Sequence, residues 1–323
     1  MSKFILKRLG VSLVLLFVVC TILFLLMHIM PGDPVLLMLG TESNPNPAAI
    51  EALRAELGLD KPLLVQYKEW MLNAVQKDLG YSYSEKIPVV KSIASRLPRT
   101  LELLGVSMLM ACMVGLPLGV WSALHQGKTS DLVMTTAASL GISIPVFVLG
   151  YLFITVFCLD IFGAGFSLPS SGYMNLSKSV SGHFIRLLLP SLTLALGLAA
   201  SIMRMTRSSM LDALSNESVC ALRAKGLPEK VVIIRHVIRN AFIPVVTVIG
   251  LQMGSLVGGT VICENVFNWP GLSTLLIKAI YQRDYPLIQG CILIMSAIFI
   301  LINLVVDVSY GILDPRARLE VAE

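Results

Sequence analysis

Long stretches without charged residues alternate with short charged segments along this chain. The uncharged stretches are bounded by Arg8 and Asp33, Glu102 and Lys128, Asp131 and Asp160, Arg186 and Arg204, Arg239 and Glu264, and Asp284 and Asp307. About 20 apolar residues of helix cross the hydrocarbon core of a bilayer, and most of these stretches reach that length. The fourth is short, but the arginines at its ends can snorkel. The pattern predicts an all-α membrane protein with six transmembrane helices.

The start of the chain also allows a cleaved signal peptide, because Lys3, Lys7 and Arg8 precede the first apolar stretch. Two features argue against cleavage. The stretch is longer than a signal core, and the sequence Met30-Pro31-Gly32-Asp33-Pro34 follows it in place of a small-residue cleavage site. We therefore expect a retained first helix.

Composition supports a membrane protein. Of the 323 residues 14% are charged and 55% are hydrophobic, with a mean hydropathy of +0.80. Soluble domains carry about 25% charged residues, so much of this surface need not face water. We expect three parts: residues 1–30 as tail and first helix, residues 31–99 as an outer helical loop, and residues 100–323 as a core of five helices.

Basic residues set the orientation, because short cytoplasmic loops are rich in Lys and Arg. The most basic loop is 204–239, with Arg204, Arg207, Arg223, Lys225, Lys230, Arg235 and Arg239 against Asp212, Glu217 and Glu229. The outer loops 160–186 and 264–285 are poor in Lys and Arg. Both termini are therefore expected in the cytoplasm.

The outer segment 31–99 is expected to hold two short helices. Residues 48–57 form a candidate helix with Pro47 at its start and Gly58 just past its end. A second is expected over about 63–77, with Leu64, Tyr67, Trp70, Met71 and Ala74 on one face. The segment can be a structured loop without chemistry, or a docking surface or lid for a substrate-delivery protein.

The inner loop 207–238 has a helix–turn–helix pattern. Ser215 and Asn216 are N-cap candidates for a helix over 217–225, and Gly226 is placed as a C′ glycine that ends it. Pro228 then opens a helix that re-enters the membrane. The short amphipathic helix needs a partner surface for its apolar residues. A basic loop that only satisfies the positive-inside rule is the simpler alternative.

At this loop the sequence resembles the permease subunits of ATP-binding-cassette importers, in the dipeptide, oligopeptide and nickel branch. The matching stretch is Glu217-Ser218-Val219-Cys220-Ala221-Leu222-Arg223-Ala224-Lys225-Gly226-Leu227. It departs from the family's EAA-type signature at Ser218, Cys220, Ala221 and Leu222, and keeps the basic end and the turn. Other matching segments lie along almost the whole chain, among them Pro31-Gly32-Asp33-Pro34, Trp269-Pro270-Gly271, Arg283-Asp284-Tyr285-Pro286 and Asp314-Pro315-Arg316.

The resemblance implies a permease of the bacterial inner membrane that is not itself an enzyme. It implies a second, paralogous permease, two ATPase subunits and a periplasmic or extracellular solute-binding protein as partners, and no nucleic acid. No Walker A sequence occurs in the chain, so ATP and Mg are expected on the ATPases. The resemblance assigns coupling to the ATPase to these residues: Glu217, Ala221, Arg223, Ala224, Lys225, Gly226 and Leu227.

Polar residues inside apolar stretches are candidates for the translocation path, because they are costly in lipid. They are Ser143, Gln252, Ser255, Asn303 and Asp307. Asp307 lies near the inner end of its stretch, so pairing with a basic residue there is the simpler role. Pro145 is expected to kink its helix. Gly250, Gly254, Gly258 and Gly259 indicate close helix packing.

The remaining residue types offer little chemistry. The six cysteines and four histidines are scattered and show no metal-ligand spacing, so no metal site is expected. The sequence leaves open whether Cys158 and Cys263 form a disulfide. An ion-coupled carrier would favour internal repeats and deeper ionisable residues, and neither is evident. Within the resembled branch the solute is a small peptide, with nickel or a nickel chelate as the alternative and glutathione also possible.

Overall fold

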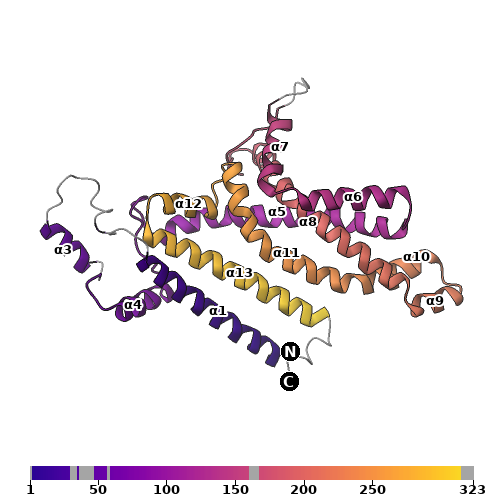
Figure 1. Ribbon diagram of the computed structural model, residues 1–323, viewed down its shortest axis with the longest axis horizontal. Coiled ribbons are helices and arrows are strands. Elements are labelled where there is room, and N and C mark those ends of the chain that lie inside the picture. The colour runs from indigo at the N-terminus through magenta and orange to yellow at the C-terminus, as the bar shows by residue number, and fades with distance from the viewer. Residues whose placement is uncertain (1, 30–34, 36–46, 57–58, 160–166, 314–323) are drawn as a thin grey trace. The chain divides into compact units, whose positions relative to one another are not determined.

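The fold is almost entirely helical (Figure 1). The computed structural model describes residues 2–29, 35, 47–56, 59–159 and 167–313. Its elements are α1 (Ser2–Ile29), α3 (Pro47–Glu56), α4 (Leu63–Val75), α5 (Val89–Leu124), α6 (Thr129–Ser143), α7 (Val146–Cys158), α8 (Val180–Leu214), α9 (Glu217–Ala224), α10 (Glu229–Val231), the π-helix η1 (Val232–Val237), α11 (Ile238–Val266), α12 (Leu272–Tyr281) and α13 (Tyr285–Leu313). Among the described residues, Tyr81 and Pro88 form an isolated antiparallel β-bridge.

The predicted membrane crossings correspond to helices. Among the described residues, five spans are long and apolar enough to cross a bilayer, and they lie in α1, α5, α8, α11 (with α10 and η1) and α13. The pair α6 and α7, bent by 106° at the break between them, passes the same test when the two helices are taken together as a sixth span. The kink expected at Pro145 is thus a complete break: Ile144 and Pro145 both leave helical geometry, with ψ of 122° and 140°. The ring of a proline disfavours helical backbone in the residue before it, which explains the stop at Ser143.

The chain divides into two compact units, residues 1–9, 101–270 and 301–323 forming one, and residues 10–100 and 271–300 the other. This division reflects packing. The sequence-based division at residues 30 and 99 stays a prediction.

In the larger unit, α5 and α8 approach each other closely through two glycines one helical turn apart. A Cβ at Gly115 would lie 2.6 Å from the Ala199 carbonyl oxygen, and one at Gly119 would lie 2.7 Å from the Met203 carbonyl oxygen. Backbone atoms cannot swing aside, so only glycine fits. The glycines predicted to pack closely were those of α11. Of those, Gly250 does meet Val306 of α13, but Gly258 has open space where its Cβ would be.

A buried histidine organises the other end of this unit. His183 on α8 is 1% exposed, and its Nε2 lies 2.6 Å from Glu102 Oε1 while its Nδ1 lies 2.6 Å from the Met174 carbonyl oxygen. Tyr173 and Trp269 stack edge-on around the same ring. These contacts attach the segment before α8 to α5 and α8.

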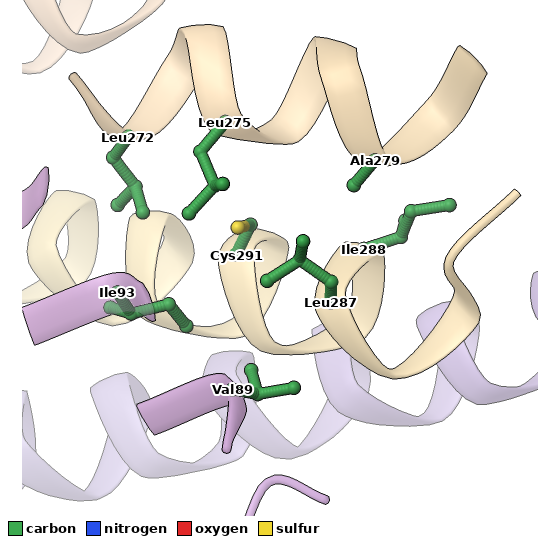
Figure 2. Packing of buried hydrophobic residues seen from close by; sticks show 8 residues of the cluster. All are labelled: Val89, Ile93, Leu272, Leu275, Ala279, Leu287, Ile288 and Cys291. Atoms are coloured by element: carbon green, nitrogen blue, oxygen red, sulfur yellow. The ribbon is translucent and has the colours of Figure 1, made fainter. Parts of the chain in front are cut away.

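The smaller unit has its own apolar core (Figure 2). Leu272 and Leu275 of α12 face Leu287, Ile288 and Cys291 of α13, with the first turns of α5 closing the cluster. The turn before α13 is fixed by Asp284, which is 1% exposed. Its carboxylate accepts hydrogen bonds from Ser82 Oγ (2.6 Å), Ser84 N (2.9 Å) and Ser84 Oγ (2.8 Å), and also from Leu287 N (3.2 Å).

All of these hydrogen bonds to the Asp284 carboxylate come from residues of the same chain. Its oxygens accept hydrogen bonds from the first turn of α13 and from the 82–84 loop. Burial raises the pKa of the nearby Tyr83 hydroxyl to about 12, and the Asp284 charge adds to the effect.

Two helices were expected in the outer segment, and both form. α3 begins at Pro47 as predicted; its expected stop at Gly58 lies outside the described residues. α4 begins at Leu63 and ends at Val75, two residues before the expected end. Tyr67, Trp70, Met71 and Ala74 form its half-buried face as predicted, but Leu64 is 83% exposed and does not belong to it.

Replacing Gly115 or Gly119 by Ala should destabilise the protein, because the new methyl group meets backbone oxygen. Overpacking of this kind costs about 1–3 kcal/mol. The measurement is the thermal unfolding midpoint of the purified protein in one detergent. Gly105→Ala on the same helix is the control, since nothing lies within 4 Å of its Cβ position. Equal midpoints for all three variants would contradict the close approach of α5 and α8.

Candidate functional site: the loop between α8 and α11

The helix α9 is a separate, locally encoded element. Asn216 is its N-cap, and the side-chain oxygen accepts a hydrogen bond from Ser218 N at 3.1 Å. Of the two predicted cap residues, Asn216 is thus the one used, while Ser215 ends α8. An N-cap of this kind stabilises a helix by about 1 kcal/mol, which matters for an element only eight residues long.

The end of α9 is a Schellman motif built on Gly226. Its φ is +74°, in the left-handed region that glycine adopts without strain. Gly226 N donates to the Arg223 carbonyl (2.9 Å), and Leu227 N donates to the Leu222 carbonyl (3.4 Å). These are the two hydrogen bonds that define the motif. The glycine predicted at C′ is confirmed in position and conformation.

Apolar residues on the inner side of this hairpin seat it on the ends of the long helices. Val219 of α9 packs with Met210 of α8, Val232 and Val237 of η1, and Ala241 of α11, and Leu222 and Leu227 flank the cluster. Val232 and Val237 are five residues apart and both fully buried. An α-helix would not place them on one side, but a π-helix with its i→i+5 bonding does.

An ion pair closes the hairpin on its solvent side. Arg223 Nη2 lies 2.6 Å from Glu229 Oε1, and Arg223 Nε lies 3.1 Å from Glu229 Oε2. The hydrogen bonds to Glu229 raise the pKa of Arg223 above its ordinary value. Exposed pairs of this kind contribute little to stability, so its role here is to orient the two helices. Arg223 thus already has a partner within the chain.

The seven residues that were predicted to couple to the ATPase lie mainly on the outer surface. Glu217, Ala221, Arg223, Ala224, Lys225 and Gly226 are exposed, and Leu227 is half-buried. The chain therefore presents one small surface, made of α9 and its turn, that a second protein can contact. A polar pocket of about 300 Å³ opens beside the start of α9 and includes Ser208, Asp212, Asn216 and Asn240.

A buried charge network supports this end of α8, and sequence reasoning missed it. Asp131 at the start of α6 accepts hydrogen bonds from Arg207 Nε (2.7 Å) and Nη2 (2.8 Å), from Ser122 Oγ (2.5 Å) and from Gly127 N (3.0 Å). The Asp131 side chain is 7% exposed and that of Arg207 is 25%. The available signal in the sequence was Asp131, a carboxylate at the start of an apolar stretch, together with Arg207 in the most basic loop.

The five pathway candidates are not gathered by the described structure into one cavity. Ser143 is exposed at the end of α6 and donates to the Ser139 carbonyl (2.9 Å). Ser255 donates to the side-chain oxygen of Gln252 (3.0 Å) on α11. Asp307 on α13 pairs with Arg8 at 2.8 Å, and Asn303 lies one turn before it. None of the five lines the apolar groove of about 320 Å³ between α11 and α13. A role in the pathway stays a prediction.

All six cysteines are free thiols in the structure, including Cys158 and Cys263. Cys263 is buried and its thiol donates to the Pro190 carbonyl at 3.4 Å. The disulfide left open by the sequence is absent between these two described residues.

The sequence matches a known protein family over nearly its whole length. Residues 115–319 match the family described as binding-protein-dependent transport system inner membrane component, and residues 1–104 match the N-terminal region of such membrane components. The glutathione transport system permease protein GsiC of Escherichia coli O6:H1 (strain CFT073) is 44% identical over 318 residues, which cover 98% of this chain and 99% of that protein. GsiC of Escherichia coli K12 is 43% identical over the same span.

Among solved structures, the fold is similar to the MetNI methionine ABC transporter in inward-facing conformations. The TM-score is 0.54 at 20% identity, covering 69% of this chain and 96% of that one. This similarity concerns the fold alone.

Substituting Arg207 by Met should destabilise the protein more than substituting Asp131 by Asn. The first change leaves a buried carboxylate without its cation, which costs about 3 kcal/mol. The second keeps an acceptor for Ser122 and leaves an arginine that reaches water, at a cost of about 1 kcal/mol. Unfolding midpoints of the two variants measure the order. The double variant should recover part of the loss of Arg207→Met, and a double variant no more stable than that single change would contradict the pairing.

Proposed function

The chain belongs to the family of binding-protein-dependent transport system inner membrane components, and we propose that it serves the import of small peptides, with glutathione as the first candidate. It is a multi-pass permease subunit of an ABC importer, and this family works with ATPase and solute-binding partners. This membership sets aside the ion-coupled carrier. The finer proposal rests on relatives named glutathione permeases, which match over nearly the full length of both chains.

The proposed complex holds this chain, a second paralogous permease and two ATPase subunits in the bacterial inner membrane. A periplasmic or extracellular binding protein delivers the solute. ATP and Mg bind to the ATPases, and this chain contributes no catalytic group. Nickel or a nickel chelate remains the alternative solute, because peptide and nickel permeases share the motifs of this loop.

The single observation that supports coupling is how α9 packs against the rest of the chain. Its outer side is free for a partner, while Val219 and the flanking leucines join it to α8, η1 and α11. A push on α9 is therefore transmitted to helices that cross the membrane. We propose that closure of the ATPases moves α9 and rocks the permease between inward and outward access.

The first test measures ATP hydrolysis by the complex purified with its co-encoded ATPases. The binding protein is loaded in turn with glutathione, with di- and tripeptides, and with nickel with and without a chelator. We expect stimulation by glutathione or other small peptides and none by nickel. Stimulation by nickel alone would replace the peptide proposal, and hydrolysis indifferent to every loaded binding protein would contradict the import function.

The second test concerns the turn. Gly226→Val should abolish solute-stimulated hydrolysis, because a β-branched residue at a φ of +74° is strained. Nothing lies within 4 Å of the Gly226 Cβ position, so the effect reports backbone conformation and not a clash. Gly226→Asn is the matched control, since asparagine tolerates this region, and it should keep most of the stimulation. Equal loss in both variants would point to a role other than the turn.

A further inference from the structure

The outer helix α4 has three distinct faces. One is half-buried and holds Tyr67, Trp70, Met71 and Ala74. A second is apolar yet exposed, and its members are Leu64 (83%), Val65 (39%), Leu72 (50%) and Val75 (75%). The third is polar, with Gln66, Glu69, Asn73 and Gln76. At about 100° per residue these groups occupy separate arcs of the helix. The exposed apolar arc has no partner among the described residues.

Contacts with α1 fix where α4 lies along that helix. The Tyr67 ring meets Phe17 and Phe24 edge-on, at centroid distances of 6.3 and 5.2 Å. Its hydroxyl shares a hydrogen bond of 2.7 Å with Thr21 Oγ1. The membrane-spanning stretch of α1 is Ile5–Leu26. Thr21 therefore lies about 7.5 Å inside the end of that stretch, at 1.5 Å per residue. Figure 1 shows α4 against the end of α1 that is remote from the N-terminus.

The same contacts fix which face of α4 points toward the membrane interior. Tyr67 reaches along α1 toward Thr21, whereas Gln66 Oε1 lies 3.2 Å from Nε2 of His28 at the outer end. Leu64 lies three residues before Tyr67, so the exposed apolar arc adjoins Tyr67 on the inward side. Glu69 and Asn73 follow Gln66 at the same spacing, so the polar arc lies on the outward side. The polarity of α4 thus follows the direction of the membrane normal that α1 defines.

We propose that α4 is an interfacial helix whose Leu64, Val65, Leu72 and Val75 insert among the acyl chains of the outer leaflet. Apolar residues of α1 next to its contacts with Tyr67 are exposed as well, since Val18, Ile22 and Leu25 are 44, 51 and 50% exposed. Interfacial helices bury their apolar face by about 5–10 Å, which agrees with the depth of Tyr67. Tyr67 and Trp70 lie at the level where aromatic side chains are enriched in membrane proteins.

Charged groups around α4 fit this placement. Glu69 on the polar arc is held by Lys61, whose Nζ lies 2.8 Å from both carboxylate oxygens. Lys68 lies between Leu64 and Leu72 on the inward side and is exposed. Its long side chain can carry the ammonium group to the phosphate level while the stem stays among apolar groups. The outer segment is thus held by lipid as well as by α1.

The test places the photo-crosslinking residue p-benzoylphenylalanine at single positions of the full-length chain, in the assembled complex in its membrane. Leu72 is the test position, Asn73 the neighbouring control on the polar arc, and Ile22 the lipid-facing reference on α1. After irradiation, mass spectrometry of this chain separates phospholipid adducts from protein adducts.

We expect phospholipid adducts at Leu72 to exceed those at Asn73 several-fold and to approach the yield at Ile22. A protein adduct at Leu72, with the binding protein or the second permease, would overturn the proposal and name the true occupant of the face. A lipid yield at Leu72 no higher than at Asn73 would overturn it as well. Neither result depends on which solute is imported, so the proposed peptide specificity stands or fails separately.

Discussion

The close approach of α8 to its neighbours is the constraint on which the larger unit depends. Gly115 and Gly119 bring α5 against the backbone of α8, and Asp131 joins the start of α6 to Arg207 near its inner end. Lipid supplies no hydrophobic force between helices, so close contact and internal hydrogen bonds must hold the bundle. α8 spans 35 residues and leads to α9 after a two-residue link, so its position sets where α9 and its turn are presented.

The coupling hairpin combines local and tertiary restraints. Asn216 and Gly226 define the two ends of α9 through hydrogen bonds within a few residues. Val219 is buried in an apolar cluster to which α5, α8, η1 and α11 all contribute. The π-helical turn at 232–237 adjusts the register at which the chain returns to the membrane, so that both Val232 and Val237 face that cluster. The hairpin is thus joined to the long helices by packed apolar side chains.

The outer segment is restrained differently. Asp284 accepts hydrogen bonds from the hydroxyls of Ser82 and Ser84 and from the backbone amide of Ser84. These bonds hold the loop before α5 at the start of α13. α4 is held by aromatic contacts to α1 and, in our proposal, by the lipid itself. A surface for a delivery protein would then rest on a helix whose depth the bilayer defines.

Periodicity and local chemistry alone were enough for much of this protein. The six apolar stretches, the turn at Gly226, the Asn216 cap, the starts of α3 and α4 and a distortion of the helix at Pro145 all follow from residues close together in the chain; that the distortion is a complete break does not. The length of an apolar stretch can be compared directly with the thickness of a bilayer, and the φ preferences of glycine and proline act on neighbouring residues. Both can therefore be recognised in the sequence.

Tertiary structure decided which polar residues meet. Nothing local indicates that Asp131 finds Arg207, that Asp284 turns inward to Ser82 and Ser84, or that His183 is enclosed by Glu102 and Met174. Likewise, Gly115 and Gly119 of α5 matter because the backbone oxygens of Ala199 and Met203 on α8 approach them, which the glycines themselves do not reveal. These pairings join residues far apart in the chain, and their geometry depends on how whole helices pack, which hydrophobic patterning does not specify.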